Sequence, residues 1–184
     1  MKFVPLPIPG TYLVHLERRG DNRGAFERVF CLSEFDSVGL AKPIVQVNRS
    51  FTQSRGTVRG MHYQLPPFAE TKTITCLRGA VYDVIVDLRK GSATFLRWHG
   101  EVLRENDDKT MVVPEGVAHG FQTLDDETEL LYLHSALYSA EHERGVAHDE
   151  PRIGIKWPLA VTELSIRDRG HDALPPTFEG IAVG

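Results

Sequence analysis

Hydrophobic and polar residues alternate along much of the chain with a period of two, which is typical of a half-buried β-strand. The clearest example is KTITCLRGAVYDVIVDLR at 72–89, which predicts two strands joined near Arg78 and Gly79. The same pattern predicts further strands at 44–52, 57–64, 93–104, 109–113 and 119–138. Turn-forming residues such as Pro114 and Gly116 separate these segments.

Only one segment carries a helical pattern. CLSEFDSVGL at 31–40 predicts a short helix with Ser33 as its N-cap. Many short strands in a chain of 184 residues predict an all-β fold, a double-sheet jelly roll or a barrel, with few short helices. The chain has no repeat, low-complexity tract or internal linker, so we expect a single domain over residues 1–184. A jelly roll can enclose one ligand-sized cavity, lined by polar residues on its inward faces.

Composition and charge bear on whether the protein binds nucleic acid or a membrane, and on its cellular compartment. The hydrophobic content of 41% suffices for a sizeable core, and the net charge of −4 comes with no basic stripe, so nucleic acid is not expected as a partner. No apolar run approaches the ~20 residues that span a bilayer, so no membrane contact is expected. Cys31 and Cys76 lack CxxC spacing, which favours free thiols and a cytoplasmic location.

Two segments resemble the paired motifs of cupins, a jelly-roll superfamily whose members often bind a metal. VPEGVAHGF at 113–121 matches the second motif and supplies His119. The first motif begins at His62, but Gln64 and Lys72 stand where the superfamily has its second histidine and its glutamate. A lysine ammonium has no lone pair to offer and repels a divalent cation. We therefore expect a cupin-type jelly roll without a metal or other cofactor.

His62, Lys72 and His119 fall at spacings that line one cavity in this superfamily. A single histidine in a strand is more often structural than catalytic, but burying all three groups for packing alone would be costly. In the functional interpretation, Lys72 supplies a positive charge that stabilises an anion in the cavity. His62 is then available to transfer protons.

Seven motifs in order resemble the dTDP-4-dehydrorhamnose 3,5-epimerase family, metal-free cupins of nucleotide-sugar metabolism. Together they extend from about Gly20 to Pro176. The motifs are DNRGAFERVF (21–30), QVNRSFTQSRGTVRGMHYQ (46–64), RGAVYDVIVDLRKGSATF (78–95), VPEGVAHGFQTL (113–124), YLHSALYSAEHERG (132–145), IKWP (155–158) and LSIRD (164–168). Their number and order, more than any single motif, carry the resemblance.

The resemblance implies an enzyme that removes and returns protons on C3 and C5 of a 4-keto sugar through an enolate. It assigns His62 as the base, Asp168 as the residue that orients its imidazole, and Tyr132 as the acid on the opposite face. Without the resemblance, Tyr132 would be interpreted as a core aromatic and Asp168 as a solvated turn residue. Three further residues would stabilise the enolate oxygen, namely Lys72, His119 and Asp83.

At the nucleotide end of the substrate, the resemblance matches Arg23 and Arg59 to residues that grip the diphosphate. Simple alternation puts Arg59 and His62 on opposite faces of one strand, so either Gly60 introduces a bulge or the two residues serve different sites. The family also implies a homodimer in which strands of one subunit help complete the neighbour's pocket. The other residues matched to the substrate site are Phe26, Gln46, Asn48 and Tyr138.

One departure from the family pattern bears on the nucleotide. Arg28 stands where the family motif has a glutamate near the nucleobase, so a CDP or GDP sugar could replace a dTDP sugar as the substrate. The sequence is also compatible with a C3-only epimerase, a ketoisomerase, and a non-catalytic jelly roll that binds a sugar nucleotide. The intact set of catalytic matches favours an enzyme over a binding module.

Overall fold

The computed structural model describes residues 1–183 as strands and loops with two short helices, α1 (Leu32–Asp36) and α2 (Ile166–Arg169). The expected all-β fold is confirmed. The strands are β1 (Lys2–Pro5), β2 (Tyr12–His15), β3 (Arg19–Asp21), β4 (Gly24–Phe26), β5 (Gln46–Thr52), β6 (Val58–Gln64), β7 (Lys72–Arg78), β8 (Ala80–Asp87), β9 (Trp98–Arg104), β10 (Lys109–Val113), β11 (Val117–Thr123), β12 (Thr128–His134) and β13 (Glu143–Gly145).

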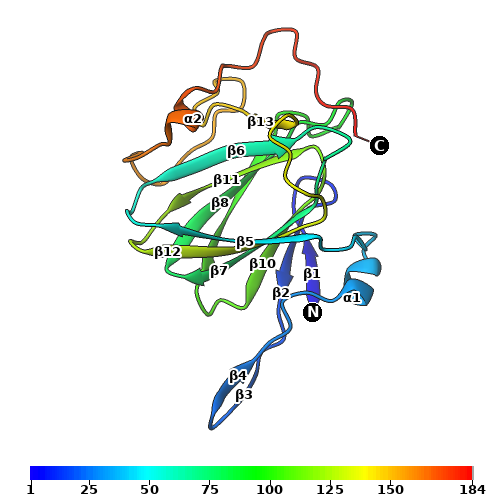
Figure 1. Cartoon of the computed structure of the whole chain (residues 1–184), viewed down its shortest axis with the longest axis vertical. Coiled ribbons are helices and arrows are strands. Elements are labelled where there is room, and N and C mark those ends of the chain that lie inside the picture. Colours follow the sequence, from blue (N-terminus) through cyan, green and yellow to red (C-terminus); the bar gives the residue numbers. More distant parts are fainter. Residues whose placement is uncertain (184) are drawn as a thin grey trace.

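Two antiparallel sheets face each other (Figure 1). One has the order β1-β2-β10-β7-β12-β5, and the other has the order β13-β6-β11-β8-β9. Inward-facing side chains of both sheets form the main core together with Ile8 from the β1–β2 connection. The sheet residues are Leu13, Ile74, Cys76, Val81, Ile85, Leu103, Met111, Val113, Val117, Phe121 and Leu130. Burial of this apolar area is the main force that holds the two sheets together.

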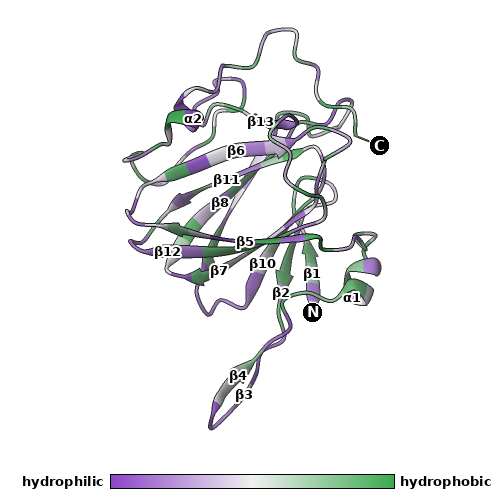
Figure 2. Cartoon of the chain, in the orientation of Figure 1, coloured by the Kyte–Doolittle hydropathy of each residue, from purple (hydrophilic) through white to green (hydrophobic). Residues whose placement is uncertain are grey.

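A second apolar cluster covers the outer face of the five-stranded sheet. The chain after β13 packs there through Ile153, Ile155 and Ile181 against Val84 and Val86 of β8. β8 is therefore buried on both faces, whereas polar and apolar residues are interleaved along β6 (Figure 2). Among residues 1–183, no helix is long and apolar enough to cross a membrane.

The predicted elements agree with the structure where alternation is strong. The segment 72–89 forms β7 and β8, and the segment 119–138 contains most of β11, a turn and β12. The helix expected within 31–40 is present, but its N-cap is Cys31, so the assignment of Ser33 was wrong. Ser33 lies inside the first turn of α1, where its hydroxyl contacts the Cys31 thiol instead of capping the helix.

A bulge in β6 decides how the cavity is lined. Opposite β11, His119 pairs with His62 and Phe121 pairs with Arg59, so three steps on β6 match two on β11. Gly60 accommodates the extra residue with a φ of 119°, and a Cβ there would lie 2.6 Å from Gly120 Cα. Without the bulge, side chains three positions apart on a strand would point to opposite faces, and the extra residue brings them to the same face. Arg59 and His62 consequently line the same cavity.

Candidate active site

A cavity of about 510 Å³ opens between the two sheets. It takes residues from β5, β7 and β12 on one side and from β6 and β11 on the other. Nine of the twelve predicted site residues line it: Gln46, Asn48, Arg59, His62, Lys72, His119, Tyr132, Tyr138 and Asp168. The volume falls within the range that encloses a small organic ligand.

His62 is hydrogen-bonded to a buried carboxylate. Its Nε2 lies 2.7 Å from Oδ1 of Asp168, whose side chain is only 3% exposed. The backbone N–H of Gly60 donates to the second oxygen at 3.3 Å, and Ser165 caps α2 by accepting from the Asp168 N–H at 3.0 Å. Asp168 is therefore fixed on both sides and does not behave as a solvated turn residue.

The hydrogen bond fixes the tautomer of His62. Burial alone would raise the pKa of Asp168, but hydrogen bonding and charge attraction from His62 outweigh it and lower that pKa. The carboxylate is therefore ionised and can only accept a hydrogen bond. His62 consequently carries its proton on Nε2 and leaves Nδ1 unprotonated as the basic nitrogen.

The pKa of His62 is lowered from its usual 6.5, chiefly by burial, with smaller contributions from the positive charges of Arg167 and Lys72. Asp168 opposes this shift without reversing it. The neutral imidazole, which is the form able to act as a base, therefore persists at pH 7 and somewhat below it.

Tyr132 stands on the wall opposite His62, because β12 belongs to the six-stranded sheet and β6 to the five-stranded one. Burial raises the pKa of the Tyr132 phenol above its usual 10.0, so the hydroxyl stays protonated. Ser50 Oγ donates to this hydroxyl at 3.4 Å, and the His119 ring meets the Tyr132 ring edge-on at 6.2 Å. A group able to accept a proton and a group able to donate one thus face the cavity from its two sides.

These pKa shifts predict the pH dependence of catalysis. A base must be deprotonated to act, so kcat/KM is expected to fall only below pH 6.5, as His62 becomes protonated. Tyr132 causes no loss of activity below pH 10.0, because its pKa is raised above that value. A profile of kcat/KM from pH 4.5 to 10 checks this. A rise in activity through pH 7 to 8 would contradict the assignment.

Lys72 is not a free charge. Its Nζ lies 3.2 Å from Glu70 Oε1 and donates to the His62 carbonyl oxygen at 3.4 Å. Asp83 does not line the cavity but lies fully buried behind it, 2.7 Å from His119 Nε2. Any effect of Asp83 on a ligand therefore passes through His119, which it orients.

The structure adds residues for which the sequence carried no signal. Glu143 accepts from the Tyr138 hydroxyl at 2.9 Å and from Arg167 Nη1 at 2.7 Å, which joins both to the wall of the cavity. Glu70 and His134 also line the cavity and are hydrogen-bonded to each other. These contacts join residues far apart in the chain, so no local spacing could have indicated them.

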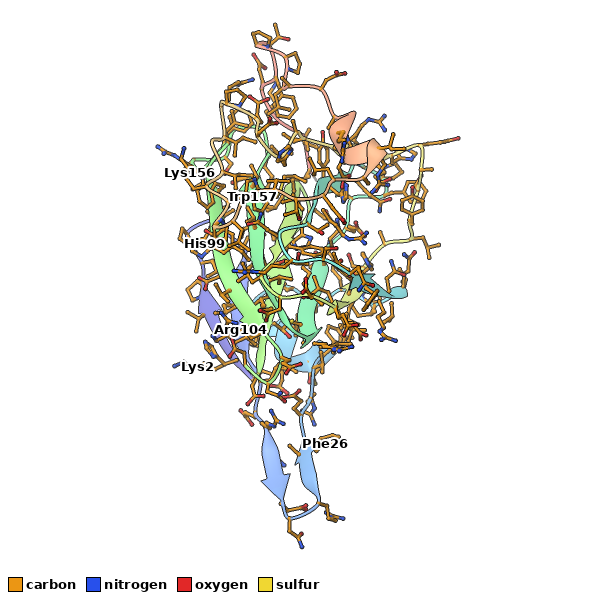
Figure 3. The ribbon with its side chains drawn as sticks, turned by 90° about the vertical axis from the view of Figure 1, so that its left-hand side faces the viewer. Lys2, Phe26, His99, Arg104, Lys156 and Trp157 are labelled. Carbon is orange, nitrogen blue, oxygen red and sulfur yellow. The ribbon has the colours of Figure 1, made fainter. Side chains whose placement is uncertain are left out.

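Arg23 and Phe26 lie outside the cavity. Both belong to the β3–β4 hairpin, which projects from the body of the molecule (Figures 1 and 3). The Phe26 side chain is 72% exposed, and the Arg23 guanidinium pairs with Asp21 at 2.6 Å. Arg28 follows the hairpin and pairs with Glu34 at 2.8 Å. Within one chain, none of these three side chains reaches the cavity.

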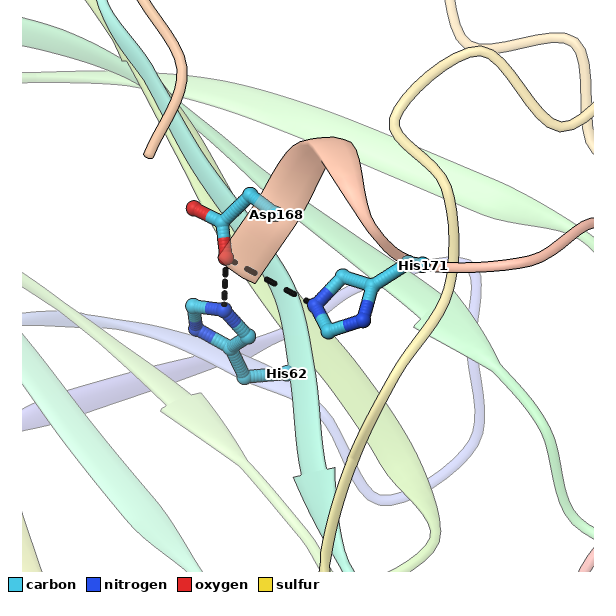
Figure 4. Close-up of side chains that lie close together, drawn as sticks. All are labelled: His62, Asp168 and His171. Atoms are coloured by element: carbon cyan, nitrogen blue, oxygen red, sulfur yellow. Dashed lines mark hydrogen bonds and ion pairs between the residues drawn. The ribbon is translucent and has the colours of Figure 1, made fainter. Parts of the chain in front are cut away.

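Three donors near Asp168 lie close enough together to be tested as a metal site. His62, Asp168 and His171 each offer one ligand atom, and these atoms lie within 4.8 Å of one another (Figure 4). Arg167 Nη2, however, lies 3.2 Å from His62 Nε2, where its positive charge would repel a metal ion. Two imidazoles and one carboxylate are a donor set that some Zn²⁺ and Fe²⁺ sites use, so the adjacent guanidinium, and not the donors, disfavours a divalent cation here.

Comparison with known proteins identifies the family. The family model described as dTDP-4-dehydrorhamnose 3,5-epimerase matches residues 5–175. The dTDP-4-dehydrorhamnose 3,5-epimerase of Sinorhizobium fredii is 41% identical over 187 residues, covering 100% of this chain and 96% of its own. The chain belongs to the dTDP-4-dehydrorhamnose 3,5-epimerase family. The family predicted from the seven motifs is thereby confirmed.

Solved structures of the family confirm the cupin-type double-sheet jelly roll. The Bacillus anthracis dTDP-4-dehydrorhamnose 3,5-epimerase, with TDP and PPi bound, superposes with a TM-score of 0.90 at 38% identity, covering 94% of this chain and 99% of its own. ChmJ, a 3'-monoepimerase from Streptomyces bikiniensis in complex with dTDP-quinovose, gives 0.85 at 32% identity, covering 92% and 86%. The family thus includes enzymes named for inversion at two carbons and at one.

Proposed function

We propose that this protein inverts C3 and C5 of a dTDP-4-keto-6-deoxyhexose. One observation carries the proposal: the His62–Asp168 pair and the Tyr132 hydroxyl face one cavity from opposite sheets. Protons next to a ketone are acidic because the carbanion is delocalised as an enolate. Inversion requires a base on one face of the sugar ring and an acid on the other, and this arrangement supplies both.

In each inversion, His62 Nδ1 takes the proton from the carbon beside the ketone. The C–H electron pair forms a carbon–carbon double bond, and the carbonyl oxygen becomes an enolate. The Lys72 ammonium lines the same cavity and would stabilise this negative charge. The enolate then collapses, and its carbon takes the Tyr132 proton on the opposite face. Exchange with water returns the imidazolium and the phenolate to their starting states.

Arg59 suits the diphosphate of such a substrate. Its guanidinium bonds only neutral oxygens in the described part of the chain, Thr52 Oγ1 at 3.0 Å and the Phe51 carbonyl at 3.2 Å. Arg49, by comparison, is neutralised by Glu129. A guanidinium without a carboxylate partner at the cavity wall is ready to bind an anion. Gln46 and Tyr138, joined by a 3.0 Å hydrogen bond, line the same cavity.

A homodimer would bring Arg23 and Phe26 to the partner's cavity. The β3–β4 hairpin carries both residues away from its own domain and exposes the Phe26 ring. Within residues 1–183, β5 pairs with β12 on one side and leaves its other edge open. That edge strand exposes the apolar side chains of Val47 and Phe51. An open edge with exposed apolar residues favours association with a second copy.

Complementation tests the shared cavity. Arg23→Ala and His62→Asn are each expected to be inactive, because one lacks a diphosphate contact and the other lacks the base. Co-expressed, they form mixed dimers in which one cavity has both residues, so about a quarter of the wild-type activity is expected. The activity of the purified mixture checks this. Activity no greater than the sum of the two separate variants would contradict a shared cavity.

Turnover assays test the substrate and the metal-free mechanism. After chelator treatment, the protein is expected to convert dTDP-4-keto-6-deoxyglucose at an undiminished rate, because Arg167 occupies the position of a cation beside His62. The CDP and GDP analogues are expected to react with lower kcat/KM. A preference for either analogue would assign a different base, and loss of activity restored by Zn²⁺ would overturn the metal-free mechanism.

A further inference from the structure

The cavity contains a histidine–carboxylate pair that the proposed mechanism does not use. His134 Nδ1 lies 2.8 Å from Glu70 Oε2, and their side chains are only 10% and 8% exposed. His134 is on β12, two residues after Tyr132, and its ring stacks on the Tyr132 ring at 6.0 Å. Burying a carboxylate and an imidazole beside an active site is costly unless each has partners.

Glu70 has a second partner on its other oxygen. Oε1 lies 3.2 Å from the Lys72 ammonium, so one buried carboxylate bridges Lys72 and His134. Burial alone would raise the pKa of Glu70, but the hydrogen bond from His134 and the charge of Lys72 outweigh it and lower that pKa. Glu70 is therefore ionised and accepts a hydrogen bond from each neighbour.

The bridge fixes hydrogen-bond directions as far as Asn48. An ionised Glu70 can only accept, so His134 donates to it from Nδ1. In the tautomer with that single proton, Nε2 has a lone pair. Asn48 Nδ2 lies 3.3 Å from that Nε2 and donates to it. The amide orientation of Asn48 is thereby set, and its Oδ1 is left to accept a hydrogen bond from a ligand in the cavity.

We propose that Glu70 is a positioning residue that holds two substrate-facing groups at once. It places the Lys72 ammonium directly, and through His134 it turns the Asn48 amide so that its oxygen meets a hydrogen-bond donor of the substrate. The proposal rests on the proposed epimerase function, because it assigns Lys72 and Asn48 to the bound sugar nucleotide. It adds Glu70 and His134, which contact those groups rather than the reacting atoms.

The substitution Glu70→Gln tests which atoms donate and which accept in the hydrogen bonds from Glu70 through His134 to Asn48. Lys72 can only donate, so the glutamine oxygen turns to it and the NH₂ group turns to His134 Nδ1. That nitrogen must then lose its proton, the proton moves to Nε2, and the Asn48 amide must rotate. The ¹⁵N resonances of His134 are expected to change from the Nδ1–H tautomer to the Nε2–H tautomer. The kcat/KM for the 4-keto sugar is expected to fall about 10- to 100-fold.

Comparing TDP binding with turnover locates the donor that Asn48 meets. If the group that donates to Asn48 belongs to the nucleotide, Glu70→Gln is expected to have both a higher Kd for TDP and a higher KM than the wild type. If that donor group belongs to the sugar, the Kd for TDP is expected to equal that of the wild type, and only kcat and KM for the 4-keto sugar are expected to change. Either outcome supports the proposal, provided that the His134 tautomer changes as well.

Glu101→Gln is the matched control. Glu101 Oε1 lies 2.7 Å from His99 Nε2 on β9, and neither residue lines the cavity, so the substitution breaks the same type of pair without touching the network. It is expected to leave kcat, KM and the His134 signals unchanged. The proposal is overturned if Glu70→Gln retains the Nδ1–H tautomer or wild-type kinetics. If instead the wild type turns over no 4-keto sugar, the proposed function fails, and the tautomer still tests the network.

Discussion

Replacement of His62 by asparagine is expected to lower kcat by about 1,000-fold, because it removes the group proposed as the base. His119 is the other imidazole on that wall and is paired with the buried Asp83 at 2.7 Å in the same way, so any activity left in the variant would be assigned to His119. The asparagine amide can still donate to Asp168, so the buried carboxylate keeps a partner. Steady-state kinetics with the dTDP-4-keto sugar measure the loss.

Two controls separate loss of the base from loss of the fold. The Kd for TDP is expected to stay within about two-fold of the wild type, since the groups proposed for the diphosphate are unchanged. His99→Asn removes a half-buried histidine outside the cavity and is expected to be fully active. If His62→Asn keeps a tenth or more of the wild-type kcat, His62 is not the base.

Tyr132→Phe is expected to separate proton exchange from inversion. The substitution removes one buried hydroxyl whose hydrogen bond, from Ser50, is long at 3.4 Å, so the fold should be little affected. His62 remains and can still remove a proton and return one from solvent on its own face. Epimerised product is therefore expected to fall about 100-fold or more, while solvent deuterium still enters the sugar with retained configuration.

Tyr82→Phe provides the control for the loss of a tyrosine hydroxyl. Tyr82 belongs to the apolar cluster on the outer face of the five-stranded sheet, and the change is expected to leave inversion at the wild-type rate. Proton NMR of the product in D₂O reports exchange and configuration together. Inversion at the wild-type rate in Tyr132→Phe, or exchange lost in parallel with inversion, would remove Tyr132 as the acid.

Charge in the cavity is largely balanced before a substrate binds. Glu70 pairs with Lys72, Glu143 pairs with Arg167, and Asp168 lies 3.8 Å from the same guanidinium. In a site shielded from water, such pairing limits the cost of keeping many ionisable groups together. Arg59 is the exception at the cavity wall, which fits a substrate whose largest charge is its diphosphate.

Much of the fold could be predicted because its strands alternate strongly. The alternation over residues 72–89 predicted two strands and the turn between them, which form β7 and β8. The spacing of His62 and Lys72, compared with the cupin motif, predicted that both line one cavity, as they do. Local sequence patterns did not predict the position of residues that are brought to the site by tertiary contacts. Asp168 resembles a turn residue in sequence, and only the packing of α2 against β6 brings it to His62.

Two features of the site lay beyond any local pattern. Whether Arg59 and His62 share a face depended on the bulge at Gly60, which the sequence allowed but did not require. Glu70 and His134 are 64 residues apart and meet because β7 and β12 pair in a register that places Lys72 opposite His134. Such contacts follow from strand register, which is set by the whole sheet.

Proton NMR of the chelator-treated protein with dTDP-4-keto-6-deoxyglucose in D₂O is the most direct test of whether one cavity transfers protons at two carbons. We expect deuterium at both C3 and C5, with inversion at each. Deuterium at C3 alone would instead assign a C3 epimerase, as in the relatives named for one carbon. No exchange with the dTDP, CDP or GDP sugar would contradict the proposed epimerase function and leave a sugar-nucleotide-binding jelly roll.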